Sequence, residues 1–184
     1  AGYCYTGGFN RGITRVHPNL RDIDLYKVSP NEKGALQHNF TSDILCDSLD
    51  RIWILSNGGG LCVVTDKQKG TVEYHNTDRN GNPNSGLCGT ALCEYDKHTL
   101  LVGSYIGFSV YDTYKDEFTN YGCITNDSTS LSHGWVYCFC VDKKKRIWVG
   151  TCSGLNKFDI KTGKFVRYGR ERGLQDDGIM GILE

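Results

Sequence analysis

Residues 136–168, VYCFCVDKKKRIWVGTCSGLNKFDIKTGKFVRY, determine the fold that the whole sequence predicts. Apolar and aromatic segments alternate in this stretch with charged or glycine-containing turns. The alternation predicts four short strands, named A to D in order, at 136–141, 147–150, 155–160 and 165–168. Strands of this length cannot bury a hydrophobic face on their own, so the unit requires neighbours of the same kind.

The rest of the chain supplies such neighbours, because the landmarks of this stretch recur along the sequence. The glycines before strand C and the tyrosines that close strand D each recur at intervals of 47 residues: Gly60, Gly107 and Gly154; Tyr74, Tyr121 and Tyr168. A landmark on strand B keeps nearly the same interval, at Trp53, Leu101 and Trp148. Residues 12–16 and 24–26 match the second half of the repeat, and residues 178–184 match its strand A.

Four antiparallel strands repeated at about 47 residues are typical of one blade of a β-propeller, so we predict an all-β propeller fold. The segment divides into a partial blade at 1–39, blades at 40–87, 88–134 and 135–177, and the first strand of a next blade at 178–184. These strands amount to about four blades, which indicates part of a larger propeller. Alternatively, residues 178–184 pair with the partial first blade, which closes a small ring and hides both edges.

Composition excludes several classes of function. The 21 basic residues balance 21 acidic ones, so no positive field for nucleic acid is expected. The longest apolar run, residues 135–141, is too short to cross a bilayer, so this segment is not expected to insert into a membrane. Nine cysteines occur without a CxxC pair or zinc-type spacing, so neither a metal nor another cofactor is predicted. Cysteine usage leaves the redox compartment open.

No catalytic constellation has the required spacing, so no catalytic residue is predicted. The five histidines are scattered along the chain, and none lies four residues from another. The pair Ser132-His133 lacks the surrounding glycines of a nucleophile elbow. Residues 47–53 have the aspartates and tryptophan of a sialidase Asp box but lack its glycine.

Residues 142–168 carry a motif more specific than the strand rhythm. Its elements are Asp142, Trp148-Val149-Gly150-Thr151, Gly154-Leu155, Asp159, Thr162-Gly163-Lys164-Phe165 and Tyr168. The motif resembles the two-component regulator propeller repeat, which builds the periplasmic sensor domain of hybrid two-component system histidine kinases in Bacteroides-type bacteria. The resemblance covers essentially the whole chain and is looser where Leu101 replaces the tryptophan.

The resemblance implies a non-catalytic, periplasmic sensor propeller fragment that senses an oligosaccharide and signals to a histidine kinase. The expected partners are therefore an oligosaccharide ligand and either the remainder of the sensor or a second copy of the chain. One alternative is a protein-interaction scaffold that uses the flat face of the propeller. A propeller lyase or glycosidase is a further alternative without a supporting motif.

Candidate ligand-binding residues follow from the topology of a blade. The connections from strand D to the next strand A and from B to C emerge on one face, around the mouth of the central channel. Glycan binding requires aromatic faces and planar polar groups. Six residues of these types are expected on that face: His38, Asn39, Asn57, Tyr105, His133 and Trp135. For Trp135, a cap on the core between two blades is the alternative role.

Overall fold

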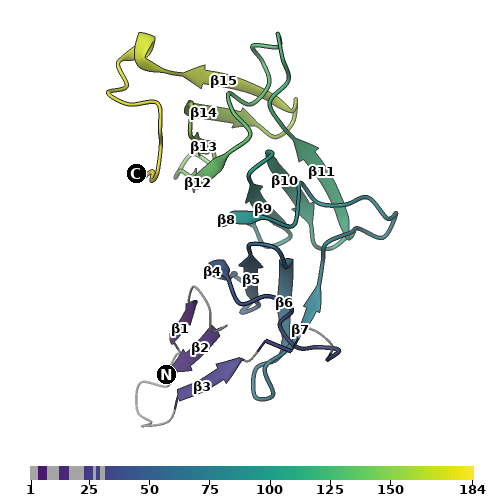
Figure 1. The fold of residues 1–184 in the computed structure, drawn as a ribbon. Helices are drawn as coiled ribbons and strands as arrows, with labels where there is room; N and C mark the ends of the chain where they lie inside the picture. Colours follow the sequence, from purple (N-terminus) through teal and green to yellow (C-terminus); the bar gives the residue numbers. More distant parts are fainter. Residues whose placement is uncertain (1–3, 8–12, 17–22, 27, 30–31) are drawn as a thin grey trace. The chain divides into compact units, whose positions relative to one another are not determined.

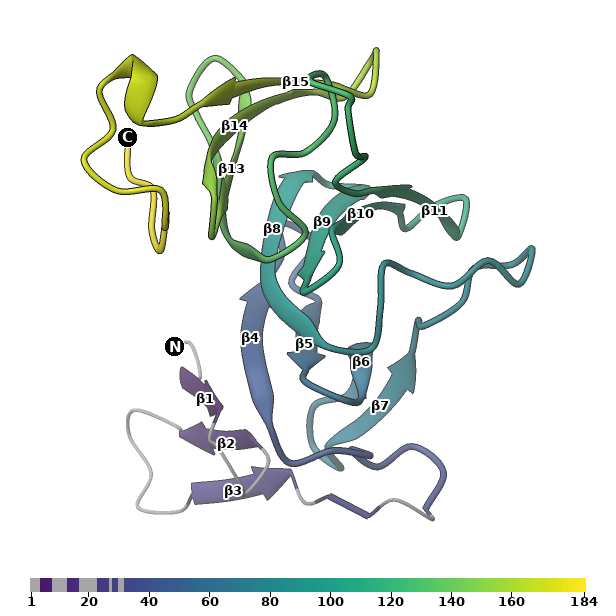
Figure 2. The same cartoon turned by 45° about the horizontal axis from the view of Figure 1, so that its top comes forward.

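The computed structural model describes residues 4–7, 13–16, 23–26, 28–29 and 32–184 (Figures 1 and 2). The described strands form four antiparallel sheets, one with three strands and three with four. Strand order within each sheet follows the chain, as in a propeller blade. The predicted all-β fold of four-stranded antiparallel blades is therefore confirmed.

The three-stranded sheet contains β1 (Cys4–Gly7), β2 (Ile13–Val16) and β3 (Ile23–Tyr26). The next sheet contains β4 (Thr41–Cys46), β5 (Ile52–Ser56), β6 (Gly60–Asp66) and β7 (Thr71–Tyr74). It is followed by β8 (Gly89–Asp96), β9 (Thr99–Ser104), β10 (Phe108–Asp112) and β11 (Glu117–Tyr121). The last sheet contains β12 (Val136–Val141), β13 (Ile147–Thr151), β14 (Gly154–Asp159) and β15 (Lys164–Tyr168), after which a 3-10 helix spans Arg170–Arg172.

The chain divides into two compact units. The first unit is Ala1–Asn76 with Leu87–Gly89, and the second is Thr77–Gly86 with Thr90–Glu184. The core of the first unit is formed by Ile13, Tyr26, Leu36, Ile52, Ile54, Cys62, Val64 and Val72. The core of the second unit is formed by Leu101, Phe108, Leu131, Val136, Ile147, Val149, Phe158 and Phe165.

An aromatic cluster joins two sheets within the second unit. Phe108 on β10 is fully buried, and its ring centre lies 5.2 Å from that of Phe158 on β14 and 6.0 Å from that of Phe165 on β15. Tyr121 on β11 and Phe139 on β12 lie at 5.5 Å from the same ring. Because the partners come from both sheets, Phe108 links the packing of one blade to that of the next.

The repeated glycines are explained by the turn between the second and third strands of each blade. Gly60, Gly107 and Gly154 all have positive φ, at 77°, 141° and 105°. At Gly154 a Cβ atom would lie 2.8 Å from the carbonyl oxygen of Tyr168. At Gly107 it would collide with the equivalent carbonyl of Tyr121. Glycine is therefore required both for the backbone conformation and for the close approach of the last strand.

Two of the turns between first and second strands contain the same buried carboxylate clamp. Asp142 accepts hydrogen bonds from the backbone N–H groups of Lys144 and Arg146, from Arg146 Nε and, at 3.0 Å, from Trp148 Nε1. Burial alone would raise the pKa of Asp142, but these donors outweigh it and hold the pKa well below its usual value. The landmark tryptophan therefore ties its strand to the turn.

Asp47 repeats this arrangement in the first unit. It accepts from Arg51 Nε at 2.6 Å and from Trp53 Nε1 at 2.8 Å, as well as from the backbone N–H groups of Leu49 and Arg51. Trp53 is 2% exposed. The middle blade has Asp96 in the corresponding turn, with one backbone bond from His98, and Leu101 in place of the tryptophan. The clamp therefore belongs only to blades that carry Asp, Arg and Trp together.

Residues 178–184, predicted as the first strand of a next blade, form no strand. Their backbone makes isolated contacts, with Ile179 N–H donating to Thr151 O at 2.9 Å, whereas a strand requires a continuous ladder.

All nine cysteines are free thiols. Cys62 is buried, whereas others, such as Cys46, are exposed.

Candidate functional site

Three of the six predicted site residues come together at one end of the blades in the second unit. Tyr105 lies in the turn between β9 and β10, and His133 and Trp135 lie in the loop between β11 and β12. The ring centres of Tyr105 and Trp135 are 5.5 Å apart in an edge-to-face arrangement. The ring of His133 lies 6.2 Å from that of Trp135, at a right angle. We call these three residues the aromatic platform.

The aromatic platform is accessible to solvent although its backbone is fixed. Trp135 is 47% exposed and Tyr105 is 37% exposed. The N–H of Trp135 donates to His133 Nδ1 at 3.0 Å, and the carbonyl of Trp135 accepts from the N–H of Cys152 at 3.1 Å. Gly134 lies against the backbone of Tyr105, where a Cβ atom would be 3.1 Å from its carbonyl oxygen. Two large side chains are thus presented to solvent from a constrained loop.

Cys152 completes this arrangement and was not predicted from the sequence. Its Sγ lies 3.0 Å from His133 Nδ1, and burial raises the pKa of its thiol, so the group is protonated at neutral pH. Because Nδ1 of His133 accepts the Trp135 N–H, the neutral ring carries its proton on Nε2. The sequence held a usable signal, because Cys152 follows Tyr105 by one repeat of 47 residues.

Ile106 is the second residue that sequence reasoning missed. It is 69% exposed and follows Tyr105 in the same turn. Its backbone lies against Gly134, at 3.2 Å from the position of a Cβ on that glycine. Its side chain lies over Gly86, so one exposed apolar side chain follows Tyr105 in this turn.

A buried polar network holds the loop before β12 to the turn after β13. Ser132 N–H donates to the side-chain oxygen of Asn156 at 3.0 Å, and the Asn156 amide donates back to Ser132 Oγ at 2.8 Å. Thr151 Oγ1 lies 3.0 Å from Ser132 Oγ and donates to Gly154 O at 2.9 Å. Asn156 and Thr151 have no exposed surface. The network fixes the base of the loop that carries His133 and Trp135.

The same network occurs one repeat earlier, with smaller side chains. Ser85 N–H donates to Ser109 Oγ at 2.7 Å, and Ser104 Oγ donates to Ser85 O and Gly107 O, each at 3.1 Å. Each of these serines precedes its counterpart in the later network by 47 residues. The hydrogen-bond networks that anchor these loops are therefore part of the repeat. The residues that the anchored loops present differ between the two blades.

The other three predicted residues lie in the first unit and form a separate set. His38 and Asn39 are exposed, and the ring of His38 lies over the glycine turn, 2.9 Å from the position of a Cβ on Gly58. Asn57 begins that turn, and its N–H donates to Phe40 O at 2.9 Å. His38 and the turn that contains Asn57 are thus adjacent.

The chemistry available at the aromatic platform is that of binding. Two ring faces and an imidazole donor suit a ligand with apolar C–H surfaces and hydroxyl groups. Within the described residues, no three His, Cys, Asp or Glu side chains are placed to hold a metal ion together. The described part of the chain also contains no helix with the length and hydrophobicity that crossing a membrane requires.

Comparison with known families identifies one repeat directly. The family model described as "Two component regulator propeller" matches residues 130–153, which include His133, Trp135 and Trp148. The match confirms the resemblance predicted from the sequence motif. No curated protein matches the chain.

Solved structures show the same fold at low sequence identity. An extracellular domain assigned to the hybrid two component system BT3049 of B. thetaiotaomicron aligns with a TM-score of 0.74 and 17% identity, over 89% of this chain and 21% of that one. An extracellular domain assigned to the one component system BT4673 of the same organism aligns with a TM-score of 0.71 and 20% identity, over 92% and 24%.

Virginiamycin B lyase from Staphylococcus aureus also aligns, with a TM-score of 0.61 and 12% identity, over 91% of this chain and 55% of the lyase. At these identities the likeness shows the fold alone. The chain spans between a fifth and a quarter of the length of the two extracellular domains.

Proposed function

We propose that the chain is a non-catalytic segment of an extracytoplasmic sensor propeller that binds an oligosaccharide and signals to a histidine kinase. The observation that carries the proposal is the aromatic platform of Tyr105, His133 and Trp135, because it lies within and beside the residues matched by the regulator propeller family. The remaining partners are then the rest of the sensor or a second copy of the chain.

The platform has the features that a sugar-binding surface requires. The faces of Tyr105 and Trp135 offer broad apolar contact to the C–H groups of a sugar ring. The Nε2–H of His133 is a hydrogen-bond donor for a hydroxyl group. The backbone bonds of Trp135 reduce the ordering that binding would otherwise require.

The location and the blade division belong to the same proposal. The two aligned B. thetaiotaomicron proteins are extracellular domains, which supports a periplasmic location. We place the blades at 40–87, 88–134 and 135–177, between a partial blade at 1–39 and the segment 178–184, which matches the first strand of the repeat in sequence alone. In this division, Tyr105 comes from one blade and Trp135 begins the next.

A protein-interaction scaffold is the second candidate function. Ile106, 69% exposed beside Tyr105, makes the surface more apolar than a sugar requires. Exposed apolar patches of this kind also occur in protein interfaces. Two results together would favour the scaffold. The wild-type chain would bind no sugar, and it would capture a protein partner that Ile106→Ser no longer captures.

Substitution of the platform tests the sugar proposal. Calorimetric titration of the 184-residue chain with a panel of plant and host oligosaccharides is expected to identify a binder. Trp135→Ala and Tyr105→Ala are each expected to weaken that binding by about tenfold or more, because aromatic anchors supply most of the energy at such surfaces.

Tyr114→Ala is the matched control, because Tyr114 is 82% exposed but lies in the turn between β10 and β11, away from the platform. The sugar affinity of Tyr114→Ala is expected to stay within about twofold of that of the wild type, since the substituted side chain touches no part of the platform. Equal losses in all three variants, or no binding to any sugar by the folded chain, would argue against the proposal.

A further inference from the structure

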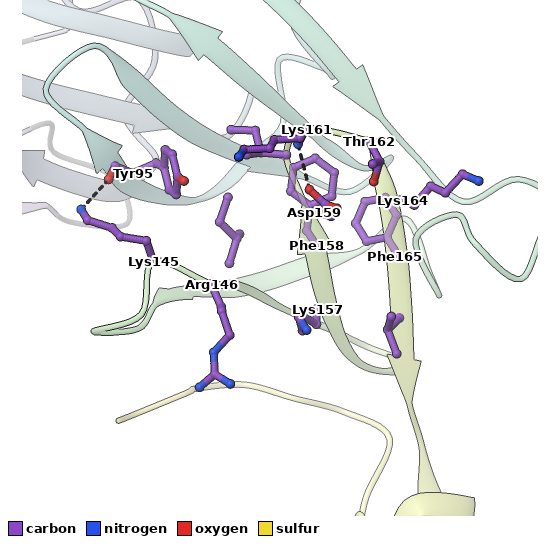
Figure 3. Close-up of a pocket in the computed structure, with 13 residues that line it drawn as sticks. Tyr95, Lys145, Arg146, Lys157, Phe158, Asp159, Lys161, Thr162, Lys164 and Phe165 are labelled. Carbon is purple, nitrogen blue, oxygen red and sulfur yellow. Dashed lines mark hydrogen bonds between the residues drawn. The ribbon is translucent and has the colours of Figure 1, made fainter.

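A cavity lies at the end of the strands of the second unit that is opposite the aromatic platform. It has a volume of about 360 Å³ and is bounded by β8, by the turn between β12 and β13 and by the turn between β14 and β15 (Figure 3). Its walls are largely apolar, formed by Tyr95, Ile147, Phe158 and Phe165. The volume falls within the range of pockets that hold small ligands, about 300–1,000 Å³.

Cationic side chains surround this apolar interior. Lys145, Lys157 and Lys161 line the cavity, and in Figure 3 the side chains of Lys145 and Lys161 both extend toward Tyr95. Lys145 Nζ donates to Tyr95 O at 3.0 Å and lies 5.8 Å from the centre of the Tyr95 ring. None of the three lysines forms a salt bridge with a residue that the structure describes.

The other charged groups of the cavity leave an excess of positive charge. Arg146 is held by Asp142, and in Figure 3 Lys164 extends away from the cavity. Asp159 is the carboxylate of the lining; it accepts the backbone N–H of Lys161 at 2.9 Å, and its single negative charge offsets only part of the charge of the three lysines. Since the whole chain has no net charge, the excess of positive charge here is local.

The equivalent turn of the first unit shows that the fold does not require this charge. Lys145 has a φ of 58°, and the residue at the same place in the first unit is Asp50, with a φ of 60°. Asp50 forms a salt bridge of 2.6 Å with Lys67 from the turn between β6 and β7. The blade of β4–β7 thus pairs opposite charges across these two turns. The blade of β12–β15 has lysines in both turns, and these lysines repel each other.

We propose that this cavity binds a ring-shaped organic anion that carries carboxylate or sulfate groups. The lysines supply the positive charge, and Lys145 and Lys161 approach from two different turns, so they can contact two anionic groups of one ligand. Tyr95, Phe158 and Phe165 provide the apolar wall for the ring. The site is distinct from the aromatic platform, so the two can succeed or fail independently.

The test is a calorimetric titration of the 184-residue chain with three anionic probes and one neutral probe. The anionic probes are a disulfated disaccharide, digalacturonate and benzene-1,3-dicarboxylate, and the neutral probe is cellobiose. If only the disulfated disaccharide or digalacturonate binds, the ligand is an acidic glycan. If only benzene-1,3-dicarboxylate binds, the ligand is an aromatic acid. Failure of all three anionic probes, or equal binding of cellobiose at this site, would overturn the proposal.

The double variant Lys145→Asn/Lys161→Gln is expected to weaken anion binding by about tenfold or more, since two charge-assisted contacts are lost. Asparagine suits position 145 because it tolerates positive φ. Lys144→Gln is the matched control, because Lys144 is exposed in the same turn but does not line the cavity. An equal loss in Lys144→Gln, with all variants retaining the wild-type melting curve, would indicate general surface charge and contradict a built site.

Discussion

Phe108→Ala is expected to lower the free energy of unfolding by about 3–5 kcal/mol, because it removes a fully buried ring and leaves a cavity. The lost contacts include four aromatic rings from two adjacent sheets. For a chain of this length the change corresponds to a decrease in melting temperature of about 10 °C, measurable by circular dichroism. Each blade of the second unit would then be less firmly packed against the next.

Two controls separate the packing of Phe108 from a general effect of substitution. Phe108→Leu keeps most of the apolar volume and is expected to cost about 1.5 kcal/mol or less. Tyr114→Ala removes an aromatic ring that is 82% exposed, so its melting curve is expected to match that of the wild type. If Phe108→Ala melts like Tyr114→Ala, the two sheets do not share a core through this residue.

Asp47→Asn is expected to destabilise the chain by about 2 kcal/mol, because an amide replaces a buried carboxylate that accepts four hydrogen bonds. The new NH₂ group would face donors at Arg51 Nε or Trp53 Nε1. The expected decrease in melting temperature is about 5 °C. Asp50→Asn is the matched control in the same turn, since the Asp50 side chain is 84% exposed and its ion pair with Lys67 is a surface contact.

The difference in stability between the wild type and Asp47→Asn is expected to depend on pH. Burial opposes ionisation of Asp47, but the bonds from Trp53 and Arg51 outweigh it and lower the pKa in the folded state. A lowered folded pKa gives stability that is present above the unfolded value of about 4 and is lost as the pH falls through the folded pKa. The stability gap between wild type and Asp47→Asn should therefore be full at pH 7 and shrink below about pH 4. A gap that is constant from pH 7 to pH 2 would show that the carboxylate charge is not what the clamp uses.

The repeat was predictable from the sequence because its landmarks have local causes. Gly107 and Gly154 recur since the turn requires positive φ and the last strand passes close by. Trp53 and Trp148 recur since each bonds an aspartate six residues earlier in its own blade. The period showed that these residues matter, but the clamp itself depends on side-chain geometry that spacing does not reveal.

The candidate site was predictable only in part. Loop position identified Tyr105, His133 and Trp135, because the topology of a blade brings these connections to one end. Cys152 and Ile106 were missed because their roles depend on how the loop of one blade lies against the turn of the next. His38, Asn39 and Asn57 satisfied the same positional rule but lie in the first unit, as a set of their own.

The most direct test of the central claim, that the aromatic platform binds a sugar, is to follow the three tryptophan indole N–H signals by NMR during titration with oligosaccharides. Trp53 and Trp148 donate these protons to Asp47 and Asp142, which keeps them within their blades. Trp135 is exposed on the platform. We expect one oligosaccharide to shift the Trp135 signal in a saturable manner while the other two signals stay in place. An unchanged Trp135 signal across the whole panel, or a larger shift at Trp148, would contradict the claim.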